Sequence, residues 1–249
     1  MNDEDAYEAL NTGASSRVLV LCDHASNHVP DDVNGGSLGI STQDMARHIA
    51  YDVGARGAAL ALAELLNTPM LACRFSRLVI DPNRGEDDPT ILMKIYDHTI
   101  VEGNRHADAA EKQRRIIAHH RPYHAAISAR LAEVTARGEV PVLVSVHSYT
   151  PQLNGRPKRP WHIGILWDKD GSIASPLIRK LAENPDICVG DNEPYSGELR
   201  GDTMYFHATQ NGYPHVLIEL RHDLIDTPEG QQKWAAILAA PLADILATL

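Results

Sequence analysis

The stretch that decides the fold covers residues 18–30 and reads Val18-Leu19-Val20-Leu21-Cys22-Asp23-His24-Ala25-Ser26-Asn27-His28-Val29-Pro30. It begins with a continuous apolar run, which is the pattern of a strand buried on both faces of a sheet. The run then changes to polar residues and a proline, so the strand ends and a loop begins. Ligands of open α/β sheets bind outside the carboxyl ends of the strands. The pair Asp23-His24 is therefore a candidate site, the alternative being a loop that only caps the strand.

Further strands alternate with helical stretches along the chain. Strands are predicted at 69–80 (two short pieces), 140–146, 161–167, 187–189 and 215–221, and helices at 41–66, 102–137 with an interruption at Pro122, 172–183, and after Thr227. This order predicts an α/β three-layer sandwich around a central mixed, largely parallel sheet. Residues 1–16 lack periodicity and are predicted to form a loose N-terminal tail, and residues 17–249 to form a single α/β domain.

Composition restricts the partners and the compartment. The formal net charge of −10 disfavours nucleic acid and anionic membranes as main partners, while a local basic pocket remains open to a small acidic ligand. Cys22, Cys73 and Cys188 lie in or beside apolar runs and are predicted to be reduced and buried. With no apolar run of membrane-spanning length and no signal peptide, we expect a cytoplasmic protein whose oligomeric state the sequence does not define.

Histidines are numerous, and most of them are expected to be ordinary. His106, His119, His120 and His124 lie in a polar helical stretch and are predicted to be exposed on the surface. In the preceding helical stretch, Asp44, His48 and Asp52 recur every four residues and would share one face of a helix. A solvated face is the ordinary explanation for this stripe.

Four predicted strand ends carry polar residues that packing alone does not require: His24, Asn83-Arg84, His147 and Glu219. Two histidines and one carboxylate are the usual protein ligands of a catalytic zinc, which activates water and polarises a carbonyl. A further carboxylate can act as general base, and an arginine can bind a carboxylate or an oxyanion. The alternatives are a core histidine at 147, a structural ion pair of Glu219 with Arg84 or Arg221, and a loop-anchoring role for Arg84.

Four separated motifs carry a resemblance to a known family: residues 22–30, Ser76-Arg77-Leu78-Val79-Ile80-Asp81-Pro82-Asn83-Arg84, His147-Ser148-Tyr149-Thr150-Pro151 and Ile218-Glu219-Leu220-Arg221. In this order they resemble the N-formylglutamate amidohydrolases, relatives of the zinc carboxypeptidases, aspartoacylases and succinylglutamate desuccinylases. The resemblance implies a zinc-carboxypeptidase-like fold with one zinc per chain at the strand ends.

The resemblance also implies a ligand set, with one departure. The related enzymes have a glutamate three residues after the first histidine, where this chain has Asn27. The family's acidic residue near the start of the next helix corresponds to Asp44. We therefore expect zinc on His24, Asp44 and His147, with Asp23, Asp52 and Asn27 as alternatives for the third ligand.

The remaining roles follow from the same resemblance. Glu219 is expected to be the base and Arg84 to hold a carboxylate or the oxyanion. The other substrate-binding candidates are Asn83, Arg77, Ser148 and Arg221; Ser148 is no nucleophile, because no Gly-rich elbow surrounds it. The expected substrate is a small acidic N-acyl amino acid, most simply N-formyl-L-glutamate. A deacylase for another acyl group, a carboxypeptidase and a non-catalytic ligand-binding relative are the alternatives.

Overall fold

A computed structural model describes residues 6–249 and has a seven-stranded sheet at its centre, with strand order β1-β3-β2-β6-β9-β7-β8. The strands are β1 (Tyr7–Leu10), β2 (Val18–Cys22), β3 (Met70–Cys73), β6 (Val142–Tyr149), β7 (Ile163–Leu166), β8 (Val189–Asp191) and β9 (His215–Arg221). The neighbours β3, β2, β6 and β9 are parallel, whereas β1 at one edge and β7 and β8 at the other run in the opposite direction. The predicted mixed, largely parallel sheet is confirmed.

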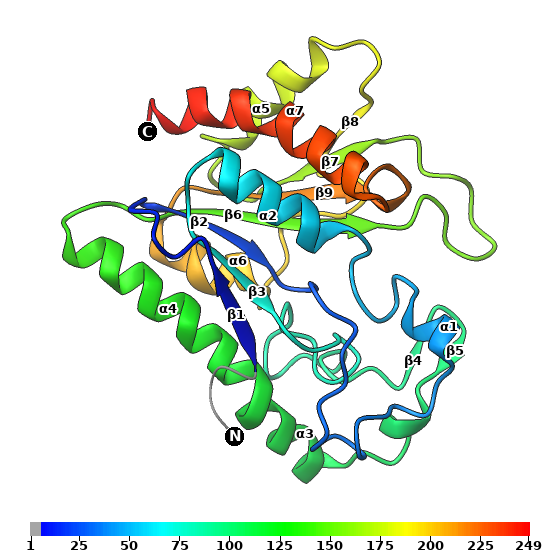
Figure 1. Ribbon diagram of the computed structural model, residues 1–249. Helices are drawn as coiled ribbons and strands as arrows, with labels where there is room; N and C mark the ends of the chain where they lie inside the picture. Colours follow the sequence, from blue (N-terminus) through cyan, green and yellow to red (C-terminus); the bar gives the residue numbers. More distant parts are fainter. Residues whose placement is uncertain (1–5) are drawn as a thin grey trace.

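Helices cover both faces of this sheet (Figure 1). One face packs against α2 (Ala55–Leu65), α5 (Ala174–Ala182) and α7 (Pro228–Leu246), and the other against α4 (Arg121–Ala136) and α6 (Thr203–His207). The shorter elements are α1 (Thr42–Met45), α3 (Ala109–Arg115) and the hairpin of β4 (Ile95–Tyr96) and β5 (Thr99–Ile100). The N-cap of α7 is Thr227, as predicted, and its side chain accepts a hydrogen bond from the Gly230 backbone N–H. Within residues 6–249, no helix is long and apolar enough to cross a membrane.

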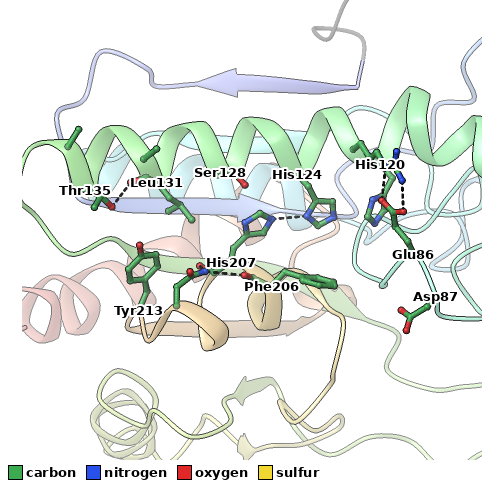
Figure 2. A pocket seen from close by; sticks show the side chains of 14 residues that line it. Glu86, Asp87, His120, His124, Ser128, Leu131, Thr135, Phe206, His207 and Tyr213 are labelled. Atoms are coloured by element: carbon green, nitrogen blue, oxygen red, sulfur yellow. Dashed lines mark hydrogen bonds and ion pairs between the residues drawn. The ribbon is translucent and has the colours of Figure 1, made fainter.

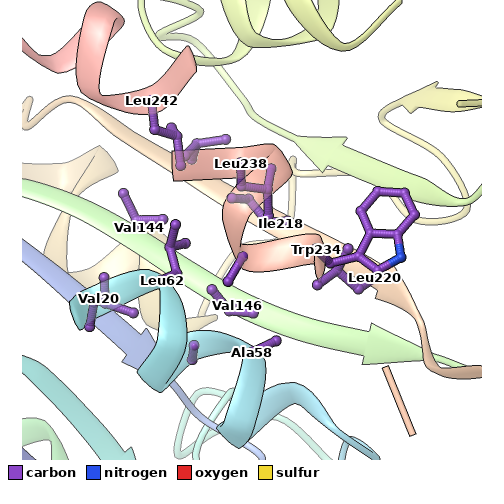
Figure 3. Close-up of a cluster of buried hydrophobic side chains, with 14 of the residues drawn as sticks. Val20, Ala58, Leu62, Val144, Val146, Ile218, Leu220, Trp234, Leu238 and Leu242 are labelled. Carbon is purple, nitrogen blue, oxygen red and sulfur yellow. The ribbon is translucent and has the colours of Figure 1, made fainter. Parts of the chain in front are cut away.

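The alternation of side chains along the strands builds two cores. Val20 of β2 points toward α2 and α7, while its neighbours Leu19 and Leu21 point to the α4 side. The first core is shown in Figure 3, where side chains of three strands meet those of two helices: Val20, Val144, Val146, Ile218, Leu220, Ala58, Leu62, Trp234, Leu238 and Leu242. Continued alternation places His147 and Glu219 on the α4 side, near the ends of β6 and β9.

The first predicted helix begins at its predicted cap, Ser41, but is interrupted between residues 46 and 54. Helix α1 ends at Met45, turns follow, and α2 begins only after Gly54, which has φ +77°. A Cβ at Gly54 would lie 2.0 Å from the backbone oxygen of Ile225, so only glycine allows this turn to pack against the loop before α7. Because the helix is interrupted, Asp44 and Asp52 do not share a face.

The predicted loose tail is also wrong where the structure describes it. Tyr7–Leu10 forms edge strand β1, paired antiparallel with β3, and Glu8 pairs with Arg56 of α2. Four residues give too short an alternation to reveal a strand in sequence, and the pairing partner lies about sixty residues away. The first five residues of the predicted tail lie outside the described part of the chain.

Three smaller expectations differ from the structure. His120 is buried and His124 partly buried, because they pack under the loop that follows Asp81 and against α6. His119 is buried against Asp32 and Phe75. The second strand-like piece, 76–80, is a turn whose apolar side chains fill the core on the α4 side. Cys22 and Cys73 are buried free thiols as predicted, whereas Cys188 is exposed.

Candidate active site

The carboxyl ends of the parallel strands bring three of the predicted residues together. His24 follows the end of β2, and His147 and Glu219 lie near the ends of β6 and β9. In the pairing of β6 with β9, His147 lies directly beside Glu219. All three line one pocket, as expected where the ends of parallel strands meet.

Asp52 stands at the centre of this group. Its Oδ2 lies 3.3 Å from Nδ1 of His24 and 2.9 Å from Nδ1 of His147, and it also accepts a hydrogen bond of 3.2 Å from the backbone N–H of Ser148. The two imidazole rings lie 5.1 Å apart in an edge-to-face arrangement, and all three side chains are buried. The interruption between α1 and α2 makes this possible, because it turns Asp52 toward the strand ends, where its backbone N–H donates to the His24 carbonyl at 2.9 Å.

Two further carboxylates hold the outer nitrogens of the same rings. Nε2 of His24 lies 2.7 Å from Oδ1 of Asp81, and Nε2 of His147 lies 3.0 Å from Oδ2 of Asp23. Asp23 is fixed in turn by hydroxyl groups, of which that of Tyr123 donates at 2.8 Å. Metal-binding histidines are typically oriented in this way by a carboxylate on the second nitrogen.

Proton counting tests whether these residues fit a metal ion. Each ring faces carboxylate oxygens with both nitrogens, yet a neutral imidazole has only one N–H. Protonation resolves this conflict for His147, whose pKa is raised. A divalent cation held by Asp52 and the two rings would resolve it for both rings without the extra proton, because each Nε2–H would still donate to Asp81 or Asp23. The ligand atoms of His24, Asp52 and His147 lie within 4.8 Å of one another, and the set of two imidazoles and a carboxylate suits Zn²⁺. The residues therefore fit a metal.

The pKa values describe a strongly ionised site. Burial raises the pKa of Asp23, but the hydrogen bond and the charge of His147 outweigh it and lower that pKa to about 2. Burial likewise opposes ionisation of Asp81, while Arg77 and His24 hold its pKa well below the usual range. Burial disfavours the charged form of His147, yet Asp23 and Asp52 raise its pKa well above the usual value. The carboxylates are thus ionised at neutral pH and attract positive charge.

Glu219 differs from these aspartates, because it lacks a partner. Within residues 6–249 it forms no ion pair, and its buried Oε2 has no hydrogen-bond partner. Burial raises its pKa to about 7, against the opposing charge of His147. Neighbouring Gly164 of β7 has no room for a side chain, since a Cβ there would lie 2.1 Å from the backbone oxygen of Glu193. A carboxyl group with a pKa near neutrality suits general acid–base chemistry.

Four of the predicted substrate-binding residues also line this pocket, with different partners. Arg77 is held at 3.0 Å by Asp81 and at 3.5 Å by Asp52, and Ser148 donates through its hydroxyl to the Val53 carbonyl. Asn83 accepts from the Thr203 backbone N–H at 2.9 Å. Arg84 alone among them has a half-buried side chain with no acidic partner in the described chain, its Nη1 donating only to the Asn83 carbonyl at 2.7 Å.

Three candidates are not brought to the pocket. Asp44 accepts a hydrogen bond from Ser41 and pairs with Arg47 at 2.8 Å on the surface, so Asp52 takes the position that we expected for it. Arg221 pairs with Asp223 at 2.8 Å and donates to the Trp161 carbonyl at 3.3 Å, so its guanidinium is bound outside the pocket. Asn27 donates to the Met45 carbonyl and lies outside the metal-binding group.

Sequence reasoning missed part of the pocket, whose volume is about 120 Å³. One wall is the loop after β8, with Tyr195, Ser196, Gly197 and Leu199, and Tyr96 and Asp202 complete the lining. Asp81 was part of a recognised motif but was given no role, although its position at a strand-like end was a usable signal. The loop after β8 carried no such signal.

The sheet with its acid–base site at the carboxyl edge defines an α/β enzyme. Comparison with known proteins then gives the family: the model of the N-formylglutamate amidohydrolase family matches residues 16–226, and the chain belongs to this family of hydrolases. No curated protein matches the chain in sequence.

Solved structures share the fold of this chain. A gene product from Agrobacterium tumefaciens is 34% identical, with a TM-score of 0.92 over 99% of this chain and 96% of that one. N-formylglutamate amidohydrolase from Ralstonia eutropha shares the fold at 22% identity, with a TM-score of 0.69 and 98% of each chain covered. A bacteriophage poly-gamma-glutamate hydrolase has a TM-score of 0.50 at 9% identity, covering 98% of this chain and 91% of that one.

Proposed function

We propose that this protein is a zinc-dependent amidohydrolase that cleaves N-formyl-L-glutamate to formate and L-glutamate. Membership of the family supports the reaction class. The observation that carries the proposal is the shared contact of two histidine Nδ1 atoms with Asp52, directly beside an unpaired Glu219.

His24, Asp52 and His147 would hold one zinc ion, with Asp52 in the role that the resemblance gave to Asp44. When bound, the ion supplies a Lewis acid that polarises the formyl carbonyl and acidifies water. Asp81 and Asp23 accept from the two Nε2–H groups, so that both Nδ1 atoms would be available to hold the ion.

Glu219 acts as the base. Its carboxylate takes a proton from the attacking water, whose oxygen forms a bond to the formyl carbon. The same proton then passes to the amide nitrogen as the C–N bond breaks, which releases formate and the amino group of glutamate. A pKa near 7 allows both transfers close to neutral pH.

Arg84 binds a carboxylate of the substrate or the developing oxyanion. It lines the pocket near the charges of Asp81 and Asp202 but forms no ion pair within the described residues, so its guanidinium can form a bidentate pair with the substrate. The cavity of about 120 Å³ is small, which favours a short acyl group on a small acidic amino acid. A cytoplasmic location and a role in amino-acid breakdown complete the proposal.

The test begins with protein purified without added metal. Elemental analysis measures zinc per chain, and formate release from N-formyl-L-glutamate is followed before chelation, after chelation and after zinc is restored. About one zinc per chain with release that depends on it supports the proposal. Zinc-independent release would refute the role of the metal, and release absent even after zinc is restored would refute the substrate.

A panel of acyl groups separates this activity from its alternatives. N-formyl, N-acetyl and N-succinyl derivatives of L-glutamate are compared by kcat/KM, together with a peptide that ends in glutamate. We expect the formyl compound to be the best substrate. Preference for a longer acyl group would indicate a related deacylase, and cleavage of the peptide alone would indicate a carboxypeptidase.

A further inference from the structure

The chain segment 82–87 is a wall between two cavities. Asn83 and Arg84 line the active-site pocket, whereas Glu86 and Asp87 line a groove of about 1070 Å³ on the other side. Figure 2 shows this groove between α4 and the α6 region, with histidines along its length. The position of Arg84 therefore depends on what holds the wall from the side of the groove.

Two histidines of the α4 region reach the backbone of this wall. Nε2 of His120 lies 2.9 Å from the carbonyl oxygen of Arg84, and Nε2 of His124 lies 2.9 Å from that of Pro82. A carbonyl can only accept, so both rings donate through Nε2–H. Four residues apart, the two side chains share one face of the helix and hold the chain on both sides of Asn83.

The tautomer of His124 also determines how it bonds to a third histidine, His207. Nε2 of His207 in α6 lies 2.8 Å from Nδ1 of His124, and the two rings are stacked at 5.1 Å (Figure 2). Since His124 donates from Nε2, its neutral ring accepts at Nδ1, and His207 donates. Burial lowers the pKa of His124 to about 3 and that of His207 to about 4, so both rings are neutral at neutral pH.

The wall is held from the sheet side as well. The Thr203 backbone N–H donates to Oδ1 of Asn83 at 2.9 Å, and the Asn83 backbone N–H donates to Oδ1 of Asp81, also at 2.9 Å. For Arg84 itself, the described residues provide one backbone contact to a side chain, that from His120. Its guanidinium extends into the active-site pocket from this point.

We propose that His120 and His124 are positioning residues that hold segment 82–87, so that Arg84 meets the substrate in one fixed place. The proposal rests on the function proposed above, in which Arg84 binds the substrate. Both histidines act through the backbone carbonyls and touch neither the substrate nor the metal-binding group.

The test compares variants that remove or keep the donor. His120→Leu and His124→Leu remove it, His120→Gln and His124→Gln keep an N–H of similar reach, and Ser128→Ala is the control on the same groove. We expect each leucine variant to lower kcat/KM at least about fivefold, with zinc content unchanged. The loss should appear in the same parameter, kcat or KM, that Arg84→Ala alters. The glutamine variants should lie within about twofold of the wild type, and so should the control.

A double-mutant cycle separates positioning from general stability. In an Arg84→Ala background the leucine substitutions should change kcat/KM by less than about twofold, because the group that they position is gone. An equally large effect in that background, or wild-type kinetics in the leucine variants, would overturn the proposal. Should a leucine variant fail to fold, His120→Asn against His120→Gln makes the same comparison, since the shorter amide does not reach the carbonyl.

Amide hydrogen exchange provides a readout without activity. The N–H groups of residues 83–86 should exchange at least about fivefold faster in the leucine variants than in the wild type or in Ser128→Ala. Faster exchange with no formate release from the wild type would refute the proposed function and keep the anchoring role. Unchanged exchange would refute the anchoring role, whatever the activity.

Discussion

Two groups of histidines are buried on the same side of the sheet and have opposite kinds of partner. His24 and His147 face carboxylates with both nitrogens of each ring. His120, His124 and His207 face backbone carbonyls or one another. The pKa of His147 is raised well above its usual value, whereas burial lowers that of His124 to about 3.

Burial alone does not determine whether a histidine in this protein is charged or neutral. Both groups are removed from water, which alone disfavours the charged ring. Carboxylates around His147 reverse that preference, and the carboxylate that His147 shares with His24 allows the two rings to hold a cation between them. Carbonyls around His120 and His124 demand one N–H from each ring and leave it neutral. The two groups should therefore respond differently to substitution and to pH.

The largest loss of activity is expected when a histidine of the first group is replaced, and a histidine of the second group is replaced for comparison. His147→Ala should lose zinc and lower formate release by at least about 1000-fold, because the ion supplies several kcal/mol to the reaction. His124→Leu should keep zinc. Elemental analysis and steady-state kinetics measure both, and zinc loss in both variants or in neither would remove the distinction between the two groups.

Glu219→Gln tests the carboxyl group beside the metal-binding residues. The amide keeps the shape but takes no proton, so kcat should fall by about 100- to 10,000-fold. Zinc content should stay at the wild-type level, because Glu219 is not a ligand. Full turnover with zinc bound would show that another group is the base.

Asp81→Asn sharpens the role attributed to the outer carboxylates. The amide no longer holds Nε2 of His24 as an anion does, and zinc affinity should fall by about 10- to 100-fold. Competition with a chromogenic chelator measures this affinity. Asp97→Asn, which alters an ion pair with Arg47 away from the pocket, is the control and should bind zinc as the wild type does.

The histidines that are held neutral, His124 and His207, should make the stability of the protein depend on pH. In the unfolded chain a histidine binds a proton below about pH 6.5, but folded His124 and His207 do so only near pH 3 and 4. The unfolded state therefore binds more protons between these values, and the free energy of unfolding falls as the pH decreases below about 6.5. At pH 5 the loss should be on the order of 2 kcal/mol for each histidine.

Urea unfolding of the wild type and of His124→Gln, each from pH 7 to 5 after chelation, isolates this contribution. Other titrating groups cancel in the difference between the two proteins. The variant should lose less stability than the wild type over this range. Equal losses would show that His124 is not held neutral.

The smallest effect concerns the carboxylate that sequence reasoning chose. Asp44→Ala should leave zinc content and kcat/KM unchanged and lower the free energy of unfolding by less than about 1 kcal/mol, since it removes an exposed ion pair. Asp52→Ala in parallel should lose zinc. Zinc loss in the Asp44 variant would restore the original ligand assignment.

These examples show what the sequence could and could not predict. Strand ends are local, since an apolar run followed by polar residues placed His24, His147 and Glu219 correctly, and β9 has the predicted bounds. The choice between Asp44 and Asp52 was not local. It depends on the turn at Gly54, where a left-handed backbone and the close approach of the distant Ile225 carbonyl both require glycine.

The prediction that the second group of histidines is exposed was wrong for the same reason. A polar helical stretch predicts exposure, and His120 and His124 are covered only because the loop after Asp81 and helix α6 pack over them. Strand β1 likewise depends on a partner far along the chain. In each case, a contact made by tertiary structure outweighed the local pattern.

Gly164 lets the loop after β8 approach the sheet beside the pocket. A methyl group at residue 164 would lie 2.1 Å from the backbone oxygen of Glu193, so a side chain there would push this loop, which forms one wall of the pocket, away from β7. The size of the cavity thus depends on a glycine that lies outside every motif that contributes a catalytic group. Replacing Gly164 by a larger residue would therefore move this wall outward and enlarge the cavity, although it would add no group to the site.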